Sequence, residues 1–162
     1  QIENIKIDQW DTSNVENMSC VFGICKSFNC DLSKWNVSKV KDMSALFYKC
    51  EKFNSDLSKW DVSNVQSFVS MFDGCKSFNS DLSKWNVSNA RDMTSMFYGA
   101  EKFNSDLSKW DVSKVQWVQS MFFNAKSLDC DLTSWGEKNE TFINTCIFHE
   151  TTNMSEDNKP KR

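Results

Sequence analysis

The stretch that decides the fold runs from residue 78 to residue 102 and reads F-N-S-D-L-S-K-W-N-V-S-N-A-R-D-M-T-S-M-F-Y-G-A-E-K. At residue 103 the opening letters F-N-S-D-L-S-K-W return unchanged. The same interval of 25 residues separates six tryptophans, which are Trp10, Trp35, Trp60, Trp85, Trp110 and Trp135. A fixed period of this length, without insertion or deletion, indicates a repeat protein whose units stack on one another.

Each unit contains two hydrophobic periods. In Trp35-Asn36-Val37 apolar and polar residues alternate, which favours a short strand with Trp and Val facing inward. The apolar positions that follow have the spacing of a helix face, and in the second unit they are Val40, Met43, Leu46, Phe47 and Cys50. We therefore expect residues 1–149 to form one α/β solenoid of about six coils, each with a short parallel strand and a short helix. The last coil is a degenerate C-terminal cap around Trp135, and residues 150–162 form a polar tail or linker.

Boundary residues support the expected helices. A serine precedes each apolar stripe, as an N-cap should; these serines are Ser13, Ser38, Ser63, Ser88 and Ser113. Gly74, Gly99 and Asn124 share a column after the stripe, where a left-handed residue would end the helix. Ile24 and Lys49 break that column, because neither is a residue type that favours left-handed backbone.

Composition excludes several classes of function. The 22 acidic and 19 basic residues give a net charge of −3, which does not favour nucleic acid as a partner. No apolar run approaches the roughly 20 residues that span a membrane. The chain has one histidine and seven cysteines, and no two cysteines form a C-x-x-C pair. It therefore lacks the residue patterns that are typical of catalytic sites and of zinc sites. We therefore expect no catalytic residues, no cofactor and no metal.

The repeat wording F-N-x-D-L-S-x-W-[ND]-V-S-N-V-x-x-M-x-x-M-F-x-G-[AC] closely resembles a bacterial surface-protein repeat of 25 to 26 residues, often called BspA-like. The resemblance covers about residues 4 to 148. It implies a leucine-rich-repeat-like solenoid that is exposed at a surface and acts in adhesion or protein binding. The family has no catalytic residues associated with the repeat, so the resemblance implies none here.

Cysteines and aspartates each allow two interpretations. Cys25, Cys50 and Cys75 share one column with alanines, which favours buried structural thiols. A zinc site at Cys146 and His149 is the weaker alternative, because no second ligand pair accompanies them. Aspartate also recurs at the 25-residue interval, at Asp31, Asp56, Asp81, Asp106 and Asp131. Carboxylates stacked in this way could bind calcium between neighbouring coils. Capping of the backbone amide two residues later is the alternative that we favour, because it explains the same aspartates without an ion.

Two surfaces are candidates for binding. The exposed side of the expected strands offers evenly spaced polar residues, which could bind a protein or a glycan or could simply be solvated; they are Lys34, Asn36, Lys59, Asp61, Lys84, Asn86, Lys109 and Asp111. Trp117 and Phe123 replace residues that are polar or hydroxyl-bearing in the other units. We expect the C-terminal coil to cover these two aromatics, and the alternative is an exposed apolar patch that marks an interface.

These patterns predict a non-enzymatic module for protein binding or adhesion, whose partner is a protein or glycan on another surface. The alternative is a structural or assembly component of a larger complex. Self-association through the C-terminal coil is possible in either case. The resemblance favours the cell surface or the extracellular space, whereas the abundance of cysteine favours an intracellular or virion component.

Overall fold

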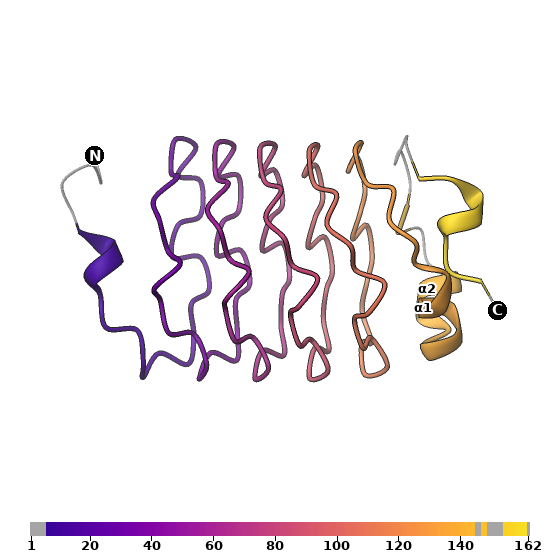
Figure 1. Ribbon diagram of the computed structural model, residues 1–162, viewed down its shortest axis with the longest axis horizontal. Coiled ribbons are helices and arrows are strands. Elements are labelled where there is room, and N and C mark those ends of the chain that lie inside the picture. The colour runs from indigo at the N-terminus through magenta and orange to yellow at the C-terminus, as the bar shows by residue number, and fades with distance from the viewer. Residues whose placement is uncertain (1–5, 145–146, 149–153, 162) are drawn as a thin grey trace.

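A computed structural model describes residues 6–144, 147–148 and 154–161. The chain winds into coils that stack side by side along the long axis, with the first and the last described residues at opposite ends (Figure 1). We number the coils one to five for residues 7–31, 32–56, 57–81, 82–106 and 107–131. The helices lie at the two ends of the stack: η1 covers Ile7–Gln9, α1 Thr133–Lys138, α2 Thr141–Asn144 and η2 Glu156–Asn158.

The expected α/β solenoid of strand-and-helix coils is wrong. Between residues 10 and 132 the structure has only turns and isolated parallel bridges, with no sheet and no helix. Where a strand was expected, the N–H of Trp35 donates to the carbonyl of Leu32, and the N–H of Val40 donates to that of Val37. These are turn bonds, so the chain bends too tightly on both sides of Trp35 to form a ladder.

The expected helix is replaced by successive turns. The N–H groups of Leu46, Tyr48 and Cys50 each donate to the carbonyl three residues earlier. The N–H groups between them, such as that of Phe47, donate to the next coil instead of to the preceding turn. All five stripe residues are nevertheless buried. The pattern therefore identified the inward residues correctly, because turns and helices both return a side chain to the same face every three or four residues.

Left-handed residues shape every coil. The column of Gly74, Gly99 and Asn124 has positive φ as predicted, although it ends no helix. Ile24 and Lys49 adopt the same conformation, with φ of 68° and 56°. A second left-handed column, which the sequence did not reveal, lies four residues earlier and contains Cys20, Ala45, Ser70, Ser95 and Ser120. The serine column predicted as N-caps caps no helix, since no helix begins there.

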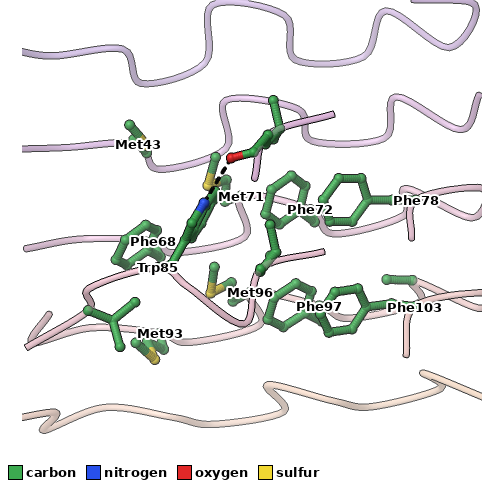
Figure 2. Close-up of a cluster of buried hydrophobic side chains, with 14 of the residues drawn as sticks. Met43, Phe68, Met71, Phe72, Phe78, Trp85, Met93, Met96, Phe97 and Phe103 are labelled. Carbon is green, nitrogen blue, oxygen red and sulfur yellow. Dashed lines mark hydrogen bonds between the residues drawn. The ribbon is translucent and has the colours of Figure 1, made fainter. Parts of the chain in front are cut away.

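Stacked tryptophans and phenylalanines fill the centre of the coils. Figure 2 shows Trp85 beside Phe72 and Met71, with its indole nitrogen at a dashed hydrogen bond. That bond runs 3.0 Å from Nε1 of Trp85 to the carbonyl oxygen of Leu57 in the preceding coil. The indoles of Trp35, Trp60, Trp110 and Trp135 make equivalent bonds of 2.8–3.1 Å. The tryptophan period is therefore both a packing repeat and a hydrogen-bonding repeat.

The C-terminal segment closes one end of the stack. Phe142 packs edge-on against Trp135 with ring centroids 4.9 Å apart, and Phe148 stacks on Phe122 at 5.7 Å. The N–H of Phe122 donates to the carbonyl of Ile147 at 3.0 Å, which continues the bonding of the coils. The described part of the segment after Trp135 thus closes this end of the stack, with two short helices, α1 and α2.

The described part of the tail, residues 154–161, packs back on this cap and is not wholly solvated. Met154 is buried, and the carbonyl of Asn158 accepts the N–H of Leu132 at 2.8 Å. A Cβ atom at Gly136, in α1, would lie only 2.1 Å from the carbonyl oxygen of Lys161. Only glycine therefore allows the tail to approach so closely.

Candidate binding surface

The polar residues predicted as a binding face are all exposed, as the sequence indicated. The two columns flank the buried tryptophans, so Lys34 and Asn36 lie on either side of Trp35. In one column the side chain also shapes the backbone: the N–H of Ser38 donates to Oδ1 of Asn36 at 3.1 Å, and Ser63 donates to Asp61 in the same way. Aspartate and asparagine both accept this bond, which explains why they alternate here. The face is regular and polar, and each of its lysines lies in the turn that precedes a tryptophan, as Lys34 does in the turn closed by the bond from the N–H of Trp35 to the carbonyl of Leu32.

The aspartate ladder caps turns. Oδ1 of Asp56 accepts the N–H of Ser58 at 2.9 Å, and Asp31, Asp81, Asp106 and Asp131 accept equivalent bonds. These hydrogen bonds stabilise the ionised carboxylate and hold the pKa of Asp56 below its ordinary value. The turn-capping interpretation is therefore confirmed. Among the described residues no group of three or more His, Cys, Asp or Glu side chains is arranged to hold a metal ion.

Shallow polar grooves run between coils beside this ladder. One is lined by residues that include Asn29, Asp31, Asn54 and Asp56. The asparagines connect successive coils directly, because Oδ1 of Asn29 accepts the N–H of Asn54 at 2.8 Å. The residues that line these grooves therefore already have a structural role, which is to hold successive coils in register.

The cysteine column is structural, as predicted. Cys50 and Cys75 are buried, and their thiols donate to the carbonyls of Phe22 and Phe47 at 3.0 Å. Burial raises the pKa of Cys50 to about 12 and that of Cys75 well above its ordinary value. Cys25, in the first coil, is only partly buried. The described cysteines are free thiols, and the possible zinc ligands Cys146 and His149 lie outside the described residues.

Trp117 and Phe123 do not share the expected environment. Trp117 is 48% exposed, so the interpretation as a covered cap residue is wrong for it. Its backbone is nevertheless fixed, because its carbonyl accepts the N–H of Met93 at 2.8 Å. Phe123 is half-buried and stacks on Tyr98 of the preceding coil, with centroids 4.7 Å apart. Tyr98 is itself exposed. Coils four and five therefore present exposed aromatic surface on a rigid backbone.

Asp73 is a feature that the sequence did not single out. It occupies the column of Tyr48, Tyr98 and Phe123, and its carboxyl is partly buried. Burial raises the pKa of Asp73 to about 6, and the nearby Lys49 and a hydrogen bond from Ser70 only partly oppose this effect. The sequence pattern that could have identified Asp73 is its place as a single carboxyl in a column where the neighbouring coils have aromatic side chains.

Two overlapping stretches of the chain, residues 1–103 and 58–160, match the family described as "Mycoplasma protein of unknown function, DUF285". Each match spans more than half of the chain. The protein belongs to this DUF285 family. The prediction of a bacterial repeat family is thus confirmed at this level, although the family description assigns no function. No curated protein and no solved structure matches the chain significantly. In the described part of this DUF285 member, no helix is long and apolar enough to cross a membrane.

Proposed function

We propose that this DUF285 protein is a non-enzymatic binding module that contacts a protein or glycan on another surface. The observation that carries the proposal is the exposure of Trp117 in a column where the other coils have Asn17, Asp42, Ser67 and Asp92. An exposed tryptophan costs solvation free energy unless a partner covers it, and tryptophan is enriched among residues that dominate binding energy. On the same two coils Tyr98 and Phe123 form a separate stacked aromatic pair.

The rigidity of the scaffold supports the same proposal. The bridge between Asp92 and Trp117 and the turns on either side hold the backbone in register with the preceding coil. A side chain on such a backbone loses little conformational entropy when it binds. The resemblance to BspA-like repeats favours adhesion and a location at the cell surface or outside the cell.

A second candidate is an assembly component inside a larger complex, in an intracellular or virion setting. It is favoured by the free thiols among the described cysteines. In this case the coils would serve to stack against another repeat-containing element and the aromatic surface would be secondary.

Binding of the labelled protein to a printed panel of glycans and to immobilised glycoproteins tests the first candidate. For a probe that binds, Trp117→Ser should weaken binding at least about tenfold. The matched control is Gln119→Ser, since Gln119 is an exposed polar residue of the same coil. Equal binding by the two variants would exclude Trp117 from the contact. Failure of the unmodified protein to bind any probe would favour the assembly candidate.

A further inference from the structure

Trp117 and Asp92 lie side by side on one face of coils four and five. A parallel bridge joins the two residues, so their side chains leave the backbone on the same side, at the spacing of about 4.8 Å between neighbouring strands. The carbonyl of Arg91 accepts the N–H of Trp117 at 3.3 Å, which places Arg91 directly beside this pair. Trp117 and Arg91 are exposed and Asp92 is partly exposed. The indole, the carboxylate and the guanidinium therefore belong to one solvent-accessible surface of the stack.

Trp117 cannot make a hydrogen bond that its column makes in coils one, two and four. Oδ1 of Asn17 accepts the N–H of the residue two positions later at 2.7 Å, and Asp42 and Asp92 accept the equivalent N–H at 2.8 and 2.9 Å. An indole has a donor but no oxygen acceptor, so the N–H of Gln119 lacks this cap. Tryptophan at this position thus gives up a stabilising bond and also exposes an apolar ring. A residue that breaks a local structural rule in this way is typical of a functional site.

The charges beside Trp117 balance each other. Arg91 contributes one positive charge and Asp92 one negative charge, and the ion pairs of the described residues all involve other side chains. In the same column as Arg91, the neighbouring coils carry the neutral Gln66 and Gln116. A cationic ligand would be repelled by Arg91 and an anionic ligand by Asp92. The surface therefore favours a neutral ligand.

The three side chains supply the groups that a sugar ring needs. A pyranose has an apolar C–H face, which packs on an aromatic ring, and hydroxyl groups that each donate and accept hydrogen bonds. Trp117 provides the ring, the guanidinium of Arg91 provides N–H donors, and Oδ2 of Asp92 provides an acceptor while Oδ1 caps a turn. A protein contact centred on a tryptophan would require apolar neighbours around it, whereas the neighbours here are charged. The composition of the surface therefore favours a glycan over a protein.

We propose that Trp117, Asp92 and Arg91 form a binding site for a neutral sugar ring of a glycan. The C–H face of the sugar stacks on the indole, the carboxylate of Asp92 accepts a hydroxyl hydrogen, and the guanidinium of Arg91 donates to a sugar oxygen. This site deepens the proposed function, on which it rests, because it selects a glycan over a protein and a neutral sugar over a charged one.

Fluorine NMR of protein labelled with fluorotryptophan tests the site directly. The seven tryptophans each give a signal, and Trp117→Phe identifies that of Trp117. The probes are neutral tetrasaccharides that end in glucose, galactose, mannose or N-acetylglucosamine, each added at millimolar concentration. We expect at least one of them to shift the Trp117 signal saturably, while the signals of the buried tryptophans stay in place. Free sialic acid and tetramethylammonium, as charged probes, should leave the Trp117 signal unmoved.

The repeat itself provides variants that keep the fold. Asp92→Asn retains the turn cap, as Asn17 does in the same column, and should weaken sugar binding at least about fivefold because a hydrogen bond to a charged acceptor is lost. Asp42→Asn makes the same change in coil two and should leave the affinity unchanged. Trp117→Asn should abolish binding, followed by saturation transfer to the sugar, yet should keep or raise the melting temperature. Asparagine restores the cap on the N–H of Gln119.

Several results would overturn the proposal. They are the absence of a Trp117 shift with every neutral sugar, equal affinities of Asp92→Asn and Asp42→Asn, and a shift with a charged probe alone. A large fall in the melting temperature of Trp117→Asn would overturn it as well, because Trp117 would then serve the fold. The proposed function fails separately: it survives if the chain binds a sugar-free protein through Trp117, and it fails if Trp117→Ser weakens no contact at all.

Discussion

The hydrogen bond of the buried indole allows a quantitative prediction for Trp85→Phe. Trp85 is buried, lies 6.5 Å from the ring of Trp110, and donates to the carbonyl of Leu57 at 3.0 Å. Phenylalanine removes this bond, which contributes about 0.5–1.5 kcal/mol, while the N–H of Trp60 still donates to the same carbonyl. The smaller ring also loses roughly two carbon groups, at about 0.8 kcal/mol each. We expect the free energy of unfolding to fall by about 2–3 kcal/mol, and by about 3–5 kcal/mol or more for Trp85→Ala.

Trp10→Phe is the matched control, because Trp10 is in the same column but is half exposed, and no hydrogen bond from its indole to a described carbonyl resembles that of Trp85. Trp10→Phe should lower the free energy of unfolding by less than about 1 kcal/mol. Urea unfolding followed by circular dichroism and by tryptophan fluorescence measures both variants, and the two signals should coincide. If the costs of Trp85→Phe and Trp10→Phe differ by less than about 0.5 kcal/mol, the indole bonds do not stabilise the stack as argued.

Three further predictions concern other parts of the molecule. Gly136→Ala should displace the chain at Lys161 at a cost of about 1–3 kcal/mol, and limited proteolysis should then cleave residues 154–161 faster. Because the pKa of Asp73 is raised to about 6, the folded protein binds more protons than the unfolded chain between about pH 4 and pH 6, so this group lowers stability as pH rises. Asp73→Asn should therefore raise the melting temperature at pH 7 and flatten its pH dependence; equal pH profiles would contradict this. In native protein at pH 8, a thiol reagent should modify the exposed Cys20 rapidly and Cys50 slowly, and comparable rates would show that the column opens readily.

Some features of the site could be predicted residue by residue. The exposure of Lys84 and Asn86 and the burial of Trp85 follow from the repeat, because each position must be either inside or outside in every coil. The caps at Asp56 and its column follow from the local chemistry of aspartate, whose side chain bonds the amide two residues later. Exposure of Trp117 could not be predicted in this way, because it depends on how residues beyond Trp135 pack.

The sequence by itself determined the 25-residue stacking period, the inward residues and the left-handed glycine column, since all three depend on a repeated local requirement. It did not determine the backbone path of the coil. Met43, Leu46, Phe47 and Cys50 have the spacing of a helix, but their backbone bonds alternate between turns and the next coil. An isolated 25-residue segment could not choose this path, because half of the N–H groups need acceptors on a neighbour. Only stacking supplies those acceptors, so the backbone path is decided by the tertiary structure.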